Sequence, residues 1–189
     1  MARNDDRRRA LADAGIAVLA GEGARGLTHR AVDRAAGVPL GTTTNYFRTR
    51  AALLQGLVER IGERLAPSEE FLAANAHREP SRDLFADYLR NIVDRLLTNR
   101  EVTIALLELR LEGIRRPEVA EIIGEWRRRG FAADVAFNEQ AGLPGTAREI
   151  ALFHHAIDGL VLDSLTGPLL DEEPLERVID ALVAGLLPG

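Results

Sequence analysis

Apolar residues recur every three or four positions along most of this chain, which is the spacing of one face of an α-helix. Leu11, Ala14 and Val18 form the first such stripe and predict a helix over residues 7–19. No Val- and Ile-rich alternating run, the pattern of a β-strand, occurs in the sequence. We therefore expect an all-α protein of about nine helices.

Two short helices separated by a tight turn are predicted near the N-terminus. Thr28 is placed to cap the first of them with its hydroxyl oxygen. Gly37 suits the left-handed conformation that ends a helix, and a second helix should start near Leu40 or Gly41 and run to about Phe47. This arrangement is typical of a helix-turn-helix.

The second short helix contains Thr42, Thr43, Thr44 and Asn45 in succession. Threonine is a mediocre helix former because β-branching restricts its side chain, so the run needs another explanation. Small side chains let a backbone approach the major groove of DNA, a Thr methyl can pack on thymine, and Asn can bond to adenine with two hydrogen bonds. We predict that this helix reads DNA.

The charge of the chain is unevenly distributed. The net charge is −5, but residues 1–50 carry nine Arg against five acids, which gives +4 and leaves −9 for residues 51–189. A basic N-terminal region attracts phosphates, and an acidic remainder helps to orient the approach to DNA. All the basic residues are Arg, and the lack of Lys excludes a Walker P-loop and Schiff-base chemistry.

Several other classes of site are disfavoured. Gly21, Gly23 and Gly26 match the dinucleotide fingerprint G-x-G-x-x-G, but a helix precedes them where that motif needs a strand, so we assign them to a connection between helices. No serine lies in G-x-S-x-G, and no histidine in H-E-x-x-H. His154 and Asp158 could supply two metal ligands, which do not make a site. We expect no catalytic residues, no metal and no cofactor.

The chain has no cysteine and no apolar run long enough to cross a membrane, and the polar residues 1–9 lead us to expect no signal peptide. The lack of cysteine excludes disulfides and thiolate metal sites. We expect a cytoplasmic protein without membrane partners.

The stretch from Gly23 to Leu54 resembles the DNA-binding head of the tetracycline-repressor (TetR) family of bacterial transcription regulators. The family pattern is roughly G-x-x-x-L-T-x-R-x-V-A-x-x-A-G-V-x-x-G-T-x-Y-x-x-F-x-[ST]-K-x-x-L. The residues that match it are Gly23, Leu27, Thr28, Arg30, Val32, Ala36, Gly37, Val38, Gly41, Thr42, Phe47, Thr49 and Leu53. Three departures that matter for DNA contact are Thr44 in place of Tyr, Tyr46 where His is frequent, and Arg50 in place of Lys.

The resemblance implies a set of DNA-binding residues. Thr28 and His29 would touch the DNA backbone, and Arg50 would hold a phosphate, although a solvated surface role for His29 stays open. Val38, Thr43 and Phe47 would pack inward. The full DNA-binding set is Thr28, His29, Arg30, Pro39, Leu40, Gly41, Thr42, Thr44, Asn45, Tyr46 and Arg50.

The remaining chain should form a helical body. We place a helix-turn-helix domain at residues 1–50 and a ligand-binding and dimerisation domain at 51–189, joined by a helix over about 50–65. Residues 66–80 are polar and read as a loop. Further helices are predicted from the caps and stripes that follow, at residues 82–97, 101–114, 117–141, 147–165 and 175–187.

The last two of these helices are too apolar for one covered face each. Such helices suggest a self-complementary four-helix interface in a two-fold homodimer, which is also how the family dimerises. A plain internal core is the alternative. The candidate interface residues are Ile150, Phe153, Ile157, Leu160, Val161, Val178, Ile179, Leu182, Val183 and Leu186.

Family bodies of this kind enclose a pocket for a small-molecule effector, and its walls should be aromatic and aliphatic with one or two polar groups. The same residues would also suit a plain core. Arg110, if it points inward, favours an anionic or carbonyl-bearing effector. The candidates are Tyr88, Leu107, Arg110, Leu111, Trp126, Phe131 and His154.

The sequence thus predicts a homodimeric regulator that binds double-stranded operator DNA, acts as a repressor and is released by an effector. The alternative is a helical small-molecule-binding or catalytic protein whose threonine-rich helix is incidental.

Overall fold

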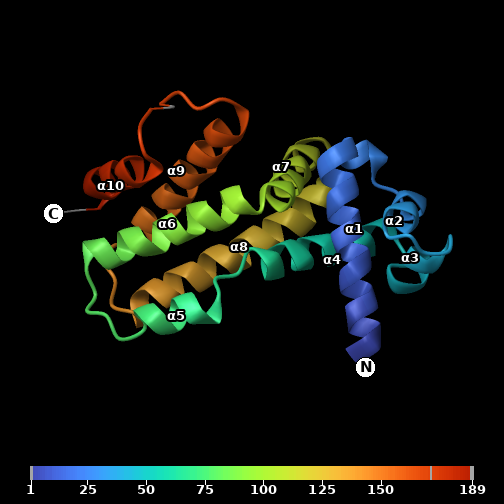
Figure 1. Cartoon of the computed structure of the whole chain (residues 1–189), viewed down its shortest axis with the longest axis horizontal. Helices are drawn as coiled ribbons and strands as arrows, with labels where there is room; N and C mark the ends of the chain where they lie inside the picture. Colours follow the sequence, from blue (N-terminus) through green and yellow to red (C-terminus); the bar gives the residue numbers. More distant parts are fainter. Residues whose placement is uncertain (1, 171, 188–189) are drawn as a thin grey trace. The chain divides into compact units, whose positions relative to one another are not determined.

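The computed structural model describes residues 2–170 and 172–187, and Figure 1 shows its helices. The described residues form no strand, which confirms the all-α prediction. None of the described helices is long and apolar enough to cross a bilayer. The helices are α1 Ala2–Gly26, α2 His29–Ala35, α3 Thr42–Tyr46, α4 Arg50–Arg64, α5 Glu69–Asn75, α6 Arg82–Thr98, α7 Arg100–Arg115, α8 Pro117–Gln140, α9 Ala147–Thr166 and α10 Leu175–Leu186.

Most helices begin where the sequence predicts. The hydroxyl oxygens of Thr28, Thr49 and Ser81 each accept a hydrogen bond at 3.1 Å from the backbone N–H three residues later. Thr146 and Glu149 form a reciprocal capping box at the start of α9. Such caps act between near neighbours in the chain, which is why the sequence reveals them.

Two short segments differ from the prediction. Residues 66–80 were expected to be a loop, but they contain α5, which Ser68 caps by accepting from the N–H of Phe71 at 3.1 Å. This helix is too short to show an apolar stripe. The first helix runs to Gly26 but is interrupted at Gly23, whose φ is 69°, so the predicted connection over Gly21–Gly26 is a kink near the end of α1.

Contacts divide the chain into two compact units, namely unit 1 (Met1–Ala66 with Asn99–Arg127) and unit 2 (Pro67–Thr98 with Arg128–Gly189). The predicted boundary at residue 50 concerns function and stays a prediction. The two compact units do not follow that boundary, because α7 packs on α1 and contributes to the same apolar core.

The core of unit 1 holds the short helices in place. Phe47, directly after α3, has a fully buried ring, and a Cβ atom on Gly56 of α4 would overlap that ring. Thr43 is buried and Val38 packs on the same core, so all three residues predicted to face inward do so.

In unit 2, helices α6, α9 and α10 surround a separate core. Six of the ten residues assigned to a dimer interface are buried within this single chain, so their side chains serve as core: Ile150, Phe153, Ile157, Val161, Ile179 and Val183. Leu160, Leu182 and Leu186 pack against that core and are partly buried, and Val178 is half-buried. A dimer contact stays a prediction, and it would fall mainly to other, exposed residues of α9 and α10.

Candidate nucleic-acid interface

Helices α2 and α3 pack together beside α1 and carry the predicted DNA-binding residues (Figure 1). The chain enters α3 through Gly41, whose φ of 92° lies in the left-handed region. Gly41 has no side chain to cap the helix. The start of α3 therefore depends on a group from elsewhere in the chain.

That group is the carboxylate of Asp33 on α2, which is fully buried. Its Oδ2 accepts from the N–H of Gly41 at 2.6 Å, and its Oδ1 accepts from the N–H and the hydroxyl of Thr43 at 2.7 and 2.6 Å. Asp33 was not among the predicted site residues. The signal was present, because Asp33 occupies the place of an Ala in the family pattern, next to the buried Val32.

The surroundings of Asp33 keep it ionised. Burial alone would raise the pKa of its carboxyl, but the hydrogen bonds from Thr43 and Gly41, together with the nearby His29, lower the pKa below its ordinary value. A buried carboxylate that accepts three hydrogen bonds is a strong cap for a helix start.

His29, one turn before Asp33 on α2, fixes the other end of α3. Its Nε2 lies 2.6 Å from the carbonyl oxygen of Phe47. A carbonyl only accepts, so we assign the hydrogen to Nε2. The ring is half-buried, which differs from a solvated surface histidine. A contact of His29 with DNA stays a prediction and would use the rest of the ring.

Arg8 on α1 supports the same end of α3. Its Nη1 donates to the carbonyl of Tyr46 at 3.2 Å, and its guanidinium lies 4.5 Å from the centre of the Phe47 ring. An arginine in this position over an aromatic face gains a cation–π interaction.

Arg50, which was predicted to hold a phosphate, also has internal partners. Its guanidinium donates to the carbonyls of Leu27 at 2.5 Å and Ala24 at 2.9 Å, and so joins the first turn of α4 to the end of α1 and the residue that follows it. These bonds use one N–H from each terminal nitrogen. A phosphate contact stays a prediction that would rely on the remaining N–H groups.

The other predicted DNA-binding residues differ in their exposure and in whether their polar groups already have hydrogen-bond partners. Thr28 uses its oxygen as a cap, Thr42 donates its hydroxyl to the carbonyl of Pro39 at 2.6 Å, and Tyr46 is half-buried against the core. The exposed members of the set are Thr28, Arg30, Pro39, Leu40, Gly41, Thr44 and Asn45.

The arrangement suits contact with DNA. Leu40 is 70% exposed at the tip of the turn, and Thr44 and Asn45 lie next to each other on the exposed side of α3. Arg25, Arg34 and Arg48, which were not predicted, are exposed in the same unit and add positive charge. The geometry thus combines a fixed short helix, exposed polar side chains and surrounding arginines.

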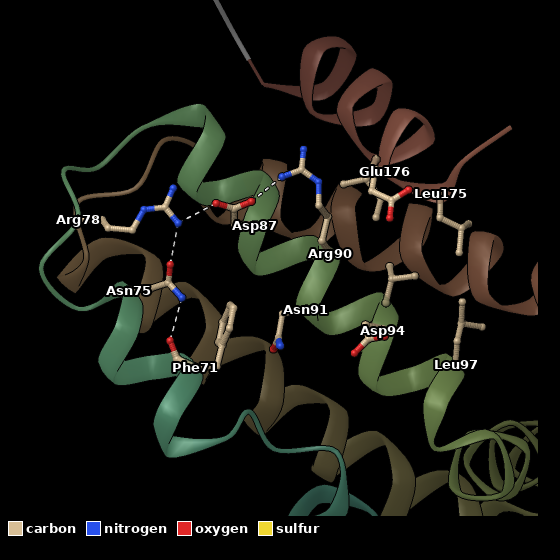
Figure 2. Close-up of a pocket in the computed structure, with 12 residues that line it drawn as sticks. Phe71, Asn75, Arg78, Asp87, Arg90, Asn91, Asp94, Leu97, Leu175 and Glu176 are labelled. Carbon is tan, nitrogen blue, oxygen red and sulfur yellow. Dashed lines mark hydrogen bonds and ion pairs between the residues drawn. The ribbon is translucent and has the colours of Figure 1, made fainter.

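Unit 2 contains a groove of about 550 Å³ between α5, α6 and α10, shown in Figure 2. Its apolar lining comes from Phe71, Val93, Leu97, Leu175 and Ile179, and its polar lining from Asn75, Arg78, Asp87, Arg90, Asn91, Asp94 and Glu176. This lining includes none of the seven residues predicted to bind an effector.

Ion pairs border one end of the groove (Figure 2). Asp87 accepts from Arg78 at 2.7 Å and from Arg90 at 2.6 Å, and Arg90 also pairs with Asp180. Because these charges compensate one another, that end is polar without a net charge.

The seven predicted effector-binding residues are distributed over both units. Leu107, Arg110, Leu111 and Trp126 belong to unit 1, whereas Tyr88, Phe131 and His154 belong to unit 2. The Tyr88 ring contacts the rings of Phe71 and Phe137 at 5.5 and 5.1 Å. Their role in binding stays a prediction.

His154 pairs with an acid other than the one considered from the sequence. Its Nε2 lies 3.0 Å from Asp134, and its ring meets the Phe131 ring edge-on at 5.6 Å. Within the described residues, no group of three or more potential metal ligands occurs.

Comparison with known families gives the decisive match. Residues 80–189 match the family model described as tetracyclin repressor-like, C-terminal domain. This chain belongs to the TetR family. The TetR-family match covers the region that the N-terminal motif does not, so two independent parts of the chain agree on the family.

Solved structures of other proteins resemble this one over nearly the whole chain. The multidrug binding protein EbrR in complex with malachite green is 28% identical, with 97% of this chain and 99% of that chain covered and a TM-score of 0.70. A TetR-family member from Streptomyces coelicolor is 26% identical over 97% and 99% of the two chains, with a TM-score of 0.71.

A transcriptional regulator from Rhodococcus, 23% identical over 95% of each chain with a TM-score of 0.71, shows the same fold. Among curated proteins, no sequence match was found. The family and the fold together make this protein a TetR-family transcriptional regulator of the ligand-responsive type.

Proposed function

We propose that this TetR-family protein is a homodimeric repressor that binds a specific operator and is released by a small-molecule effector. One observation carries the DNA-binding part of the proposal. Helix α3 is held at both ends by residues outside it, while Thr44 and Asn45 remain exposed. Fixed, exposed side chains of this kind can read base edges in a major groove.

A dimer would place two copies of α3 on one face of DNA. Two half-sites about 34–36 Å apart would then lie in successive major grooves of a roughly palindromic operator. Exposed residues of α9 offer a surface for pairing, because Leu152, Gly159 and Leu162 recur at helical spacing and a Cβ on Gly159 would meet nothing. Ala181, Ala184 and Gly185 are small and exposed on α10.

The dimer surface can be tested with a matched pair of leucines. Leu162→Glu should give a monomer in sedimentation at micromolar concentration, because a charge would enter the paired face. Leu111→Glu is the control, since Leu111 on α7 is 48% exposed and Leu162 is 49% exposed. Dimerisation that survives Leu162→Glu would contradict this placement of the interface.

The groove of unit 2 is the effector site that we favour. Its volume lies within the range of small-molecule sites, and it combines an aromatic and aliphatic lining with a few polar groups. EbrR has been crystallised with ethidium, malachite green and proflavin, so aromatic dyes of this kind are suitable first probes. The seven residues predicted from the sequence are the alternative location.

Two phenylalanines distinguish these locations. Phe71 lines the groove, whereas Phe131 belongs only to the predicted set. In a fluorescence titration with malachite green, Phe71→Ala should weaken binding about tenfold, the effect of losing a good aromatic contact, and Phe131→Ala should not. The reverse result would place the effector among the predicted residues.

An effector releases DNA only if it binds the DNA-free conformation more tightly than the DNA-bound one. Adding a bound probe to the protein–operator complex should therefore weaken operator binding by the ratio of those two affinities. A probe that binds tightly without altering operator affinity would not be an inducer.

The decisive experiment is selection of genomic DNA fragments by the purified protein, followed by affinity measurements on the enriched sequence and on a scrambled duplex. We expect a roughly palindromic sequence and a clear preference for it at physiological salt. No retention of DNA even at low salt, where phosphate contacts are strongest, would refute the proposal.

A further inference from the structure

Helix α3 cannot depend on its own sequence for stability. It has five residues, three of which are Thr. Helices shorter than about 12 residues are marginal in water even with good helix formers, and β-branched side chains lower the propensity further. The orientation of Thr44 and Asn45 must therefore be set by groups outside α3.

One neighbouring helix supplies those groups at both ends of α3. Asp33 binds the N–H groups of Gly41 and Thr43 at the start, and His29 binds the carbonyl of Phe47 at the end. His29 and Asp33 are four residues apart on α2, so they lie on the same face, one turn apart. That face of α2 spans the length of α3.

We propose that Asp33 and His29 are positioning residues for operator recognition, acting as a clamp that holds both ends of α3 in the orientation that reads bases. The proposal rests on the DNA-binding function proposed above. The clamp touches no base itself, and it acts through Thr44 and Asn45, which it keeps in a fixed orientation.

A consequence concerns phosphate binding. The N-terminus of a helix is often an anion site, because its N–H groups lack partners. In α3 the N–H groups of Gly41 and Thr43 are already bonded to Asp33. Phosphate contacts must therefore come mainly from other groups, such as the exposed guanidinium groups of Arg30 and Arg48.

The sign of the effect separates positioning from charge. Removing a carboxylate from a DNA-binding surface lowers repulsion with phosphates, so a purely electrostatic role predicts tighter binding in Asp33→Asn. Loss of the clamp predicts weaker binding to the operator, with little change on scrambled DNA. Asn cannot replace Asp here, because its NH2 group would face one of the backbone N–H donors.

The variants for the test are Asp33→Asn, Asp33→Ala and Thr43→Val, the last of which removes only the hydroxyl that bonds Asp33. Asp6→Asn is the matched control, because Asp6 is an exposed acid on α1 of the same unit. Affinity is measured for the operator and for a scrambled duplex, and amide hydrogen exchange is followed at residues 41–47.

We expect Asp33→Asn and Asp33→Ala to lose about tenfold in operator affinity, comparable to one good base contact, and Thr43→Val to lose less. Exchange should accelerate at residues 41–47 while the amides of α1 stay protected. Asp6→Asn should bind each of the two duplexes as well as the wild-type protein does, or slightly more tightly. If the Asp33 variants do not fold, Thr43→Val and the His29 variants decide the question.

His29 allows a rescue test. A glutamine can place its amide N–H close to the position of Nε2, so His29→Gln should retain operator preference, whereas His29→Leu should lose it. Unchanged or increased operator preference in Asp33→Asn, Thr43→Val and His29→Leu, with wild-type exchange at residues 41–47, would overturn the clamp. Failure of the wild-type protein to bind any DNA would instead overturn the proposed function.

Discussion

The region around α3 in unit 1 and the groove of unit 2 use their polar side chains in different ways. There, Asp33, His29, Arg8 and Arg50 all bond to backbone groups at or near the ends of helices. In unit 2, the arginines and acids around the groove mostly bond to one another, as in the pairs of Asp87 with Arg78 and Arg90. Backbone bonds fix a local chain path, whereas pairs between side chains can rearrange.

This difference matches the tasks proposed for the two units. A surface that reads a DNA sequence must hold a few side chains in one orientation, because each base contact depends on geometry. A groove that admits small molecules benefits from side chains that can adjust to the shape of the ligand. The following predictions test whether unit 1 is indeed the more tightly determined of the two.

The largest effect on stability is expected from removing the buried ring of Phe47, which directly follows α3. Phe47→Ala should lower the free energy of unfolding by about 3–5 kcal/mol, because it empties a fully buried site next to Gly56. Phe137→Ala in unit 2 is the control and should cost much less, since Phe137 is 39% exposed. Urea denaturation followed by circular dichroism measures both. Equal losses would remove the contrast between the units.

The next effect concerns reading of DNA. Asn45→Ala should reduce discrimination at one base position by about 1–3 kcal/mol and leave the other positions unchanged. Asn91→Ala, in the groove of unit 2, should not alter DNA binding. Affinities for an operator and its single-base variants check this prediction. A uniform loss at all positions would mean that Asn45 contacts the DNA backbone instead.

A smaller effect separates two neighbouring arginines. Arg50→Ala should lower the free energy of unfolding by about 1–2 kcal/mol, because two carbonyls lose a half-buried charged donor. Arg48→Ala should leave stability unchanged and reduce the slope of log affinity against log salt by about 1 if Arg48 contacts a phosphate. If Arg50→Ala reduced the slope of log affinity against log salt without lowering stability, Arg50 would contribute mainly to DNA binding and little to the fold.

The smallest effect appears only in acid and compares a cap from each unit. Burial by itself would raise the pKa of Asp33. The hydrogen bonds from Thr43 and Gly41 outweigh burial, so the pKa of Asp33 is lowered. Glu149 has a lowered pKa because of hydrogen bonds from Thr146. A lowered folded-state pKa gives stability that is present above the unfolded-state pKa and is lost as the pH falls through the folded-state pKa.

Stability should therefore decrease as the pH drops below 3.8, the ordinary value for Asp33. Asp33→Asn should flatten this decrease, and Glu149→Gln should flatten it less, because Glu149 is only partly buried whereas Asp33 is fully buried. Urea midpoints between pH 6 and pH 3 provide the measurement. Equal flattening by both variants would indicate that burial of the cap is unimportant.

The sequence by itself determined features that depend on near neighbours. The cap formed by Thr28 acts over three residues, so its place in the chain was sufficient to locate it. Helical stripes predicted the fold class for the same reason. The family resemblance in turn supplied the exposed residues of α3, among them Thr44 and Asn45.

Only the tertiary structure decided which groups hold α3 and which apolar residues are core. The bonds of Asp33 and Arg50 join residues between 8 and 26 positions apart, and their approach depends on how whole helices pack. The same holds for Phe153 and Ile179, which an apolar face alone could assign either to a partner or to the core of their own chain. Hydrophobicity specifies that a side chain is buried, and packing specifies against what.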